Sequence, residues 1–541
     1  MVPSLDSLRS VIAGYTGKRA GLAAFIATEF KTSERSARRW LRNMDDTKPV
    51  CAGTVDAPDV RRSVLSGSRF VITTAQNNTK AHGGFLKSLE KYCEHNKAQL
   101  LVVRCTYNKH GFQNLEKSRK DLWYDKRLEP YLIDSKSYRF QANRRENLVL
   151  CAELDILPTA ERPLSGLTNY SRAASCIVPH VKLAMESVPT DLGFASECGP
   201  KLMYTTGAVT QRNYIQRKAG QKADFHHVYG AVVLEFSGDK WFVRQLVAST
   251  HGGFYDLTDY YSPEGVSHGH RVKSLVLGDL HLPHPPGGSP HVTAVFGETG
   301  LLTALKPEYM FLHDLIDFKV ENHHNRTSGM WRMQTAHTTV SDELDDARDQ
   351  LCALVARCHE AIPDGTEINI VWSNHMDALL RWLDESDWRE QRTPRDAMLL
   401  LRLQHKALEI LAKPGPEQAL PHFRAMCDMR LFMELFKDIP ATWLYRGTPG
   451  VINGVAHGMH GHLGPGGSRG NPGNLNKIGV KATIGHGHAA RILDGVYQVG
   501  VMCPTRLGYN EGPNNWSHTH CIMYPNGKRA MITTVGGAWR G

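Results

Sequence analysis

Five short clusters of aspartate, asparagine and histidine lie in the second half of the chain, each directly after a hydrophobic run. The clusters are Asp279-Leu280-His281, His313-Asp314, Asn374-His375, the histidines of 457–462, and His486-Gly487-His488. The preceding runs, such as 272–277 and 367–372, are typical of buried β-strands. Because functional side chains collect beyond the carboxyl ends of strands in α/β sheets, we expect the five clusters to converge on one site.

The donor atoms in these clusters favour a metal centre. They are carboxylate oxygens, an amide oxygen and imidazole nitrogens, with no cysteine among them. Such donors suit Mn, Fe, Zn and similar divalent ions rather than a thiolate-built zinc site. Two ions about 3.5–4 Å apart need one shared carboxylate and two sets of terminal ligands. The clusters supply that many, so we expect two divalent ions, Mn²⁺ first, with Fe, Zn, Mg or Ni as alternatives.

The order of these motifs resembles the calcineurin-like metallophosphoesterase superfamily over roughly residues 270–541. That superfamily has the pattern D-x-H, GDxxD, GNH plus an acid, H (often HGH) and GHxH. The resemblance implies a double-layer β-sandwich flanked by helices, with a dinuclear metal centre at its edge. The ligands that it implies are Asp279, His281, Asp314, Asn374, His460, His486 and His488.

The resemblance also implies roles for these residues. Asp279, His281 and His488 would bind the first ion, and Asp314 would bridge both. Asn374, His460 and His486 would complete the second. His375 would be the acid that protonates the leaving alkoxide or steadies the phosphoryl oxygen, and Asp317 would orient a ligand.

The chain departs from the superfamily pattern at three places. His313 and Ser373 stand where glycine is usual, and the acid that normally follows the motif histidine is displaced by Met376 to Asp377. Asp377 is our candidate partner of His375. The fourth motif leaves a choice between His457 and His460, and we favour His460 because the superfamily often has HGH there.

Other polar residues are candidates for contacts with a phosphate. His323 and Arg326 follow the second motif, where they could line the pocket rim or simply form a polar loop. Arg469 lies in the glycine-rich segment after the fourth motif, and guanidinium groups and backbone amides both suit oxyanions. His518 and His520 also spell H-x-H, but they open an expected β-hairpin and are interpreted as structural.

The elements that must position these residues form an α/β (α+β) chain of several parts. Residues 269–541 carry the metallophosphoesterase pattern, and 67–268 read as an α/β domain of unknown role, with strands near 69–74, 100–105, 147–154, 230–236 and 241–246 and a helix near 84–97. Residues 49–66 read as a linker. Residues 1–48 read as a small helical, helix-turn-helix-like unit.

The front of the chain is basic. Residues 1–150 hold 27 Lys and Arg against 15 Asp and Glu, a net charge of +12, whereas the whole chain carries +10. One expected helix, 34–44, has an apolar stripe backed by arginines, as in a recognition helix. The arginines are Arg35, Arg38, Arg39 and Arg42. They are our candidates for DNA contact, the alternative being a solvated basic helix.

These features lead to one principal functional hypothesis and two alternatives. We expect a metal-dependent phosphodiesterase or nuclease that hydrolyses DNA, and the HGHLGPGGSRG, GHGH and DGVYQVG segments resemble early-expressed tailed-phage metallophosphoesterases associated with host-genome degradation. The alternatives are a small-molecule or nucleotide phosphoesterase, and a non-enzymatic DNA-binding regulator with an inactive metal-bound domain. We expect a homo-oligomer with no membrane partner. Scattered cysteines and the lack of a signal-peptide pattern favour the cytoplasm, of the bacterial host if phage-encoded.

Overall fold

The chain forms two compact units, Met1–Arg61 and Arg62–Gly541. The computed structural model describes residues 22–31, 33–34, 37, 63–107, 122–143, 147–189, 199–283, 289–322, 327–413, 415–437, 439–508, 510 and 512–541. In the first unit it describes helix α2 (Leu22–Glu29). Arg35, Arg38, Arg39 and Arg42, which carry the helix-turn-helix prediction, lie outside the described residues.

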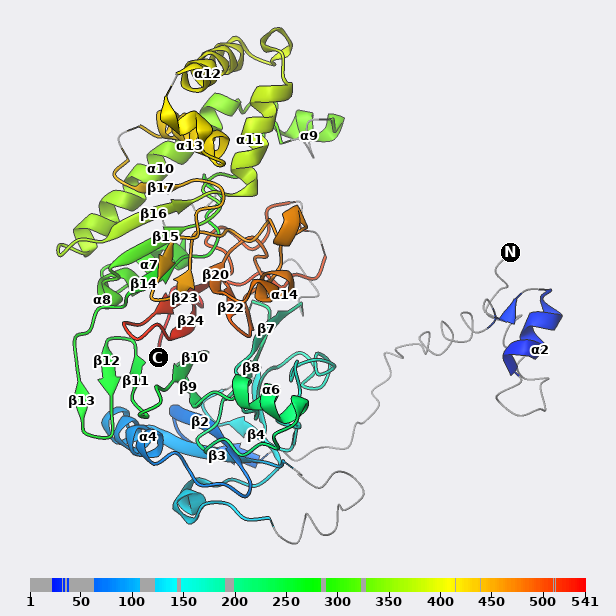
Figure 1. The fold of residues 1–541 in the computed structure, drawn as a ribbon, viewed down its shortest axis with the longest axis vertical. Helices are drawn as coiled ribbons and strands as arrows, with labels where there is room; N and C mark the ends of the chain where they lie inside the picture. The colour runs from blue at the N-terminus through cyan, green and yellow to red at the C-terminus, as the bar shows by residue number, and fades with distance from the viewer. Residues whose placement is uncertain are drawn as a thin grey trace. The chain divides into compact units, whose positions relative to one another are not determined.

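The second unit is mixed α/β, as predicted, and a six-stranded sheet carries the first three polar clusters (Figure 1). Its order is β17-β16-β15-β14-β23-β24. The strands are β14 (Ser274–Val276), β15 (Tyr309–Leu312), β16 (Glu367–Val371), β17 (Thr442–Leu444), β23 (Thr519–Met523) and β24 (Arg529–Thr533). The first four run parallel, so their carboxyl ends share one edge. The last two form the expected antiparallel hairpin.

An eleven-stranded sheet carries the other two clusters, in the order β1-β4-β5-β6-β8-β7-β21-β22-β20-β19-β18. Its strands before residue 268 are β1 (Ser63–Leu65), β4 (Ser137–Phe140), β5 (Leu148–Cys151), β6 (Ser175–Val178), β7 (Met185–Val188) and β8 (Lys201–Thr205). Those after it are β18 (Val451–Ile452), β19 (Val455–Ala456), β20 (Lys481–Ile484), β21 (Arg491–Leu493) and β22 (Val496–Gln498). The two sets join where β7 pairs with β21. One sheet therefore runs across the boundary that the sequence suggests near 268, and the division there stays a prediction.

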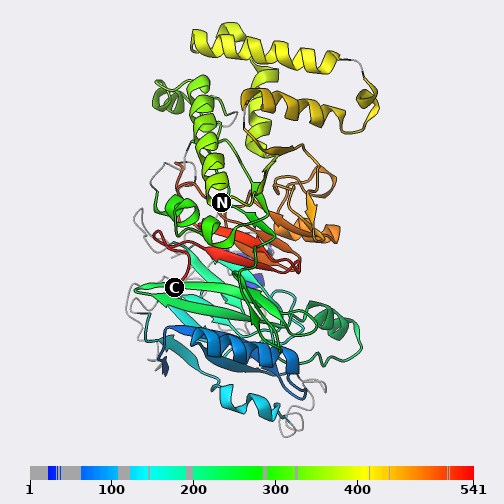
Figure 2. The ribbon, with the colours of Figure 1, turned by 90° about the vertical axis from the view of Figure 1, so that its left-hand side faces the viewer.

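Two smaller sheets complete the strands. The four-stranded sheet contains four of the five strands predicted in the front segment, β2 (Arg69–Gln76), β3 (Gln99–Cys105), β9 (Gly230–Ser237) and β10 (Lys240–Val247). The fifth, predicted near 147–154, is the shorter strand β5 of the eleven-stranded sheet. Helix α4 (Gly83–Asn96), also predicted, packs against β2 and β3 (Figure 2). The three-stranded sheet consists of β11 (Phe254–Asp256), β12 (Asp259–Tyr261) and β13 (Val266–Ser267).

The remaining helices gather mostly on one face of the six-stranded sheet. They are α6 (Lys218–His226), α7 (Pro290–Phe296), α8 (Leu301–Leu305), α9 (Gly329–Gln334), α10 (Val340–Ala361), α11 (Asn374–Glu385), α12 (Pro394–Ala412), α13 (Phe423–Leu435) and α14 (Pro472–Leu475). Helix α10 begins at Val340, where a Thr339–Asp342 capping box closes its first turn. None of the described helices is long and apolar enough to cross a membrane.

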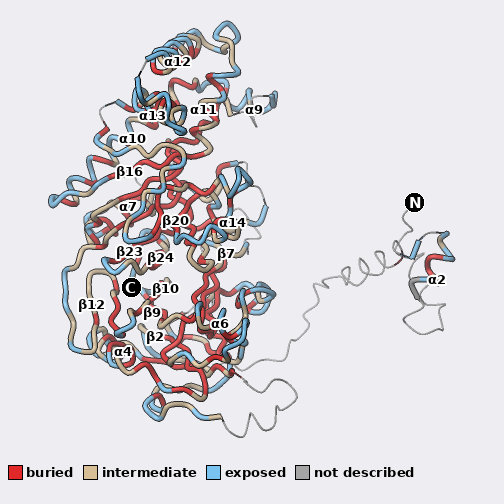
Figure 3. The backbone as a smooth tube through the Cα atoms, viewed as in Figure 1, coloured by how far each residue is buried: buried red, intermediate tan, exposed pale blue. Residues whose placement is uncertain are grey.

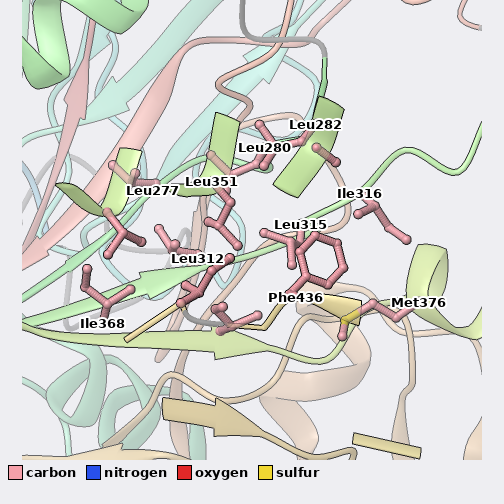
Figure 4. Packing of buried hydrophobic residues seen from close by; sticks show 14 of the residues in the cluster. Leu277, Leu280, Leu282, Leu312, Leu315, Ile316, Leu351, Ile368, Met376 and Phe436 are labelled. Carbon is pink, nitrogen blue, oxygen red and sulfur yellow. The ribbon is translucent and has the colours of Figure 1, made fainter. Parts of the chain in front are cut away.

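Most residues of β14, β15, β16, β23 and β24 are buried (Figure 3). On the helical face, Leu312 and Ile368 pack with Leu351 of α10 and Met376 of α11 in one cluster (Figure 4). On the other face, alternate residues of β14, β15 and β16 share a cluster with residues of the eleven-stranded sheet, including Tyr497 of β22. This packing fixes the strand ends, and therefore the loops that carry the polar clusters.

Candidate metal centre

Asp314 stands at the centre of the converging clusters, on the loop after β15. Its Oδ2 atom lies 3.4 Å from the Nε2 atom of His281 and 3.4 Å from the Nε2 atom of His460. His281 follows β14, and His460 follows β19 of the other sheet. One carboxylate therefore lies between candidate donors from two sheets.

The histidines and Asp279 complete one side of the site. The Nε2 atoms of His281 and His488 lie 3.0 Å apart, and His488 Nε2 lies 3.1 Å from Asp279 Oδ2. With Asp314 these residues form a fully buried group whose donor atoms all lie within 4.8 Å of one another. They could hold a metal ion.

Asn374 organises the other side. Its Oδ1 atom accepts hydrogen bonds from His460 Nε2 at 3.0 Å and from His486 Nδ1 at 3.1 Å. The main-chain N–H of His486 donates to Asp279 Oδ2 at 2.7 Å, which ties the two sides together. All seven ligands that the sequence nominates are thus brought to one place.

The buried oxygen atoms of the site fit a cation. Asp279 Oδ1 and both carboxylate oxygens of Asp314 are buried without a hydrogen-bond partner. Two adjacent buried carboxylates are costly unless positive charge compensates them. Because every donor is oxygen or imidazole nitrogen, the site suits a divalent ion of the Mn, Fe or Zn type.

Protonation also favours ligation. Burial lowers the pKa of His486 and of His488 to about 4, so both rings are neutral at pH 7, as ligands must be. Burial alone would raise the pKa of Asp314, but His375, His460 and His281 hold it well below its ordinary value. Burial and the charge of Asp314 raise the pKa of Asp279.

Four of the nominated ligands have left-handed backbone conformations. The φ angles are 51° at His281, 49° at Asp314, 68° at His486 and 57° at His488. A residue with a side chain pays about 1 kcal/mol or more for this conformation. Such strain collects at functional sites, because surrounding structure holds the side chains where the chemistry needs them.

His375 and Asp317 lie beside the candidate ligands. His375 Nδ1 donates a hydrogen bond to the main-chain oxygen of Asp317, and its Nε2 lies 3.8 Å from Asp314 Oδ2. The Asp317 carboxylate lies 3.1 Å from His281 Nδ1, where it can fix the orientation of that ring. Burial alone would lower the pKa of His375, but Asp314 and Asp317 raise it.

The pairing expected for Asp377 differs in the structure. Asp377 accepts a hydrogen bond from Trp372 Nε1 at 2.8 Å, forms an ion pair with Arg446, and lies 3.4 Å from His462. Asp377 is not the partner of His375, because it lies one turn into α11. The imidazole of His375 contacts Asp317 instead. The displaced acid therefore contacts Arg446 and His462 rather than His375.

The structure separates the two candidates in the fourth motif. His460 lies in the site, whereas His457 stacks on Phe311 with ring centroids 4.8 Å apart and lies 3.4 Å from Ser274 Oγ. Sequence reasoning overlooked His313. It is fully buried, neither ring nitrogen has a hydrogen-bond partner, and it forms a possible metal-holding group with Asp279 and His460. Its replacement of the usual glycine was the available signal.

Further residues considered from the sequence are the three candidates for phosphate contact and the two histidines at 518 and 520. His323 and Arg326 lie outside the described residues, and Arg469 is exposed in the loop after the fourth motif. His518 donates from Nε2 to the main-chain oxygen of Cys503, and His520 Nδ1 accepts from the N–H of Gly278, each at 3.0 Å. These two histidines brace loops behind the site, which agrees with the structural interpretation.

Comparison with known proteins places the chain by its sequence. No protein-family model matches it, and no solved structure matches it. It is 37% identical over 541 residues to Protein A1 of Escherichia phage T5, an alignment that covers 98% of this chain and 93% of that protein. Identity at that level over nearly the full length of both chains shows common descent, and the chain belongs to the family of phage T5 Protein A1.

Proposed function

We propose that the protein is a metal-dependent phosphodiesterase that hydrolyses DNA through a dinuclear centre. The observation that carries the proposal is the position of Asp314 Oδ2, 3.4 Å from a histidine of each side of the site. A shared carboxylate between two sets of terminal donors is what a two-metal site requires. The order of the motifs, and the packing of two sheets behind them, are consistent with the double β-sandwich of the calcineurin-like metallophosphoesterases.

The residues present suggest a division of labour. A pair of divalent ions at this site would supply Lewis-acid activation of water and of the phosphoryl group. The charges of Asp314 and Asp317 raise the pKa of His375 and so favour its doubly protonated imidazolium. Its Nδ1–H donates to the main-chain oxygen of Asp317, and its Nε2–H would deliver a proton to the leaving alkoxide. Asp317 would keep His281 in position, and the buried surroundings would exclude bulk water.

The choice of DNA rests on charge and relationship. The net charge of +12 over residues 1–150 would attract a phosphate backbone, and this attraction weakens with salt. The related protein comes from a bacteriophage. We infer action on host DNA early in infection, in the cytoplasm of the infected bacterium, by a homo-oligomer.

The test uses the purified full chain with Mn²⁺ and three substrates: plasmid DNA, an aryl phosphodiester and mononucleotides. DNA cleavage that is lost in Asp279→Ala and His375→Ala would support the proposal. Turnover of mononucleotides alone would overturn it in favour of a nucleotide phosphoesterase, and no hydrolysis with any divalent ion would favour a regulator. Replacing Arg35, Arg38, Arg39 and Arg42 together should weaken DNA affinity and spare aryl phosphodiester turnover.

A further inference from the structure

We propose that His95, Asp259 and His268 form a second, mononuclear metal site, separate from the buried centre. The three residues come from three elements. His95 lies in the last turn of α4, Asp259 begins β12, and His268 follows β13. One donor atom from each lies within 4.8 Å of the other two. Two imidazoles and one carboxylate form a ligand set typical of Zn²⁺ and related ions.

The distances already approach those of a coordinated ion. His268 Nδ1 lies 3.0 Å from Asp259 Oδ1, and the rings of His95 and His268 have centroids 5.2 Å apart. Metal–ligand bonds of about 2.0–2.1 Å at tetrahedral angles separate two donors by about 3.3 Å. Small rotations of exposed side chains would therefore suffice, and His268 is 56% exposed.

Neighbouring hydrogen bonds hold the elements that carry the three donors in fixed positions. Asn96 Nδ2 donates to the hydroxyl of Tyr261 at 2.9 Å, and that hydroxyl donates to Asp259 Oδ2 at 3.4 Å. Oδ1 of Asp259 is thus the oxygen that faces His268. Tyr92, one turn before Asn96, donates to Asp256 of β11 at 2.8 Å. The last turn of α4 is therefore fixed against the three-stranded sheet, and His95 is carried to its edge.

The solvent side of the three donors leaves a fourth position for water or another small ligand. An ion there would join α4 to β12 and to the segment after β13, which are linked at present by side-chain hydrogen bonds. We infer a structural role, because one ion would tie together three elements that are separate in the chain. Binding only to the folded state would raise the melting temperature of the chain.

The test measures bound zinc per chain by elemental analysis after desalting, together with the Co²⁺ absorption spectrum, in the full chain. His95→Ala and His268→Ala should each lower the zinc content by one ion and reduce the zinc-induced rise in Tm. His405→Ala, an exposed histidine of α12, is the matched control and should change neither. Asp314→Asn should impair the buried centre and leave this site intact.

Two results would overturn the proposal. Zinc content equal to that of the wild type in both His95→Ala and His268→Ala would show that the group binds no ion. An equal loss in His405→Ala would show non-specific binding by surface histidines.

Because Asp259→Asn keeps the shape of the side chain and removes its charge, it should weaken zinc binding by at least about tenfold without unfolding the sheet.

Discussion

The Nε2 atoms of His281 and His488 lie 3.0 Å apart, although 207 positions separate the residues in the chain. The two rings meet edge to face, at an interplanar angle of 85°. Both residues have left-handed backbone conformations. These conformations are strained, and they hold the two rings toward each other. Two imidazole nitrogens aimed at one point could supply half of a coordination sphere.

His460 and His457 differ by three positions and should behave differently. His460→Ala should lower the number of bound metal ions and abolish hydrolysis, because this ring lies 3.4 Å from Asp314 Oδ2. His457→Ala should keep the metal content and lower the free energy of unfolding by about 1–3 kcal/mol, because it removes a buried ring that stacks on Phe311. Elemental analysis and urea denaturation measure the two effects. Equal metal loss in both variants would contradict the assignment.

His375→Ala should lower kcat for an aryl phosphodiester by about 10²- to 10⁴-fold, the usual cost of losing a positioned acid. Metal content should remain at the wild-type value, because His375 is not among the candidate ligands and its Nε2 lies 3.8 Å from Asp314 Oδ2. Steady-state kinetics measures the loss of kcat, and elemental analysis measures the metal content. A kcat within a factor of three of the wild type would remove His375 from the mechanism.

His313→Leu should raise stability and weaken metal binding at once. Leucine of similar volume removes two buried ring nitrogens that lack hydrogen-bond partners, each of which costs about 1–3 kcal/mol. In the presence of a chelator, the unfolding midpoint in urea should therefore rise. If His313 also contacts an ion, isothermal titration should give a lower affinity for Mn²⁺. A higher midpoint with unchanged affinity would limit His313 to a packing role.

Glu235 should make the fold sensitive to acid. Burial alone would raise its pKa, but Arg244 and Arg69 lower it from 4.5 to about 2. The carboxylate is thus more acidic in the folded than in the unfolded chain. Its contribution, about 3 kcal/mol by linkage, is complete above pH 4.5 and is lost as the pH falls toward 2.

Glu235→Gln should remove that contribution at pH 7 and flatten the dependence of stability on pH between 4.5 and 2. Urea denaturation at several pH values measures both. Glu434→Gln is the control, because this exposed residue pairs with Lys406 and Lys437 at 3.7 Å, and such pairs contribute less than about 1 kcal/mol. A Glu235→Gln variant as stable as this control at pH 7 would contradict the argument.

The features that were predictable are those written locally in the chain. Each strand that leads into a motif is a short apolar run, and the polar residues that follow it include the candidate ligands, so the convergence around Asp314 followed from periodicity and chain order. The partner of His375 was not predictable in this way. Asp377 is its neighbour in sequence, but Asp317 reaches it through the pairing of β15 with β16.

The extent of the sheet was not predictable for the same reason. The pairing of β7 with β21 places Glu186 opposite Arg491, and the local sequence of neither strand indicates which strand it pairs with. His313 shows a different limit. A histidine in place of a glycine could change only the turn, and its burial beside Asp279 and His460 is visible only once both sheets are in place.

The joined sheet has a consequence for synthesis on the ribosome. Ser187, at the end region of β7, donates a hydrogen bond to the main-chain oxygen of Asn515, 328 positions later. Until β21 and that loop emerge, β7 is an unpaired edge that invites association with other chains. The strands before residue 268 therefore cannot complete this sheet until nearly the whole polypeptide has been synthesised. A chain truncated before residue 491 would lack β21 and would be prone to aggregate.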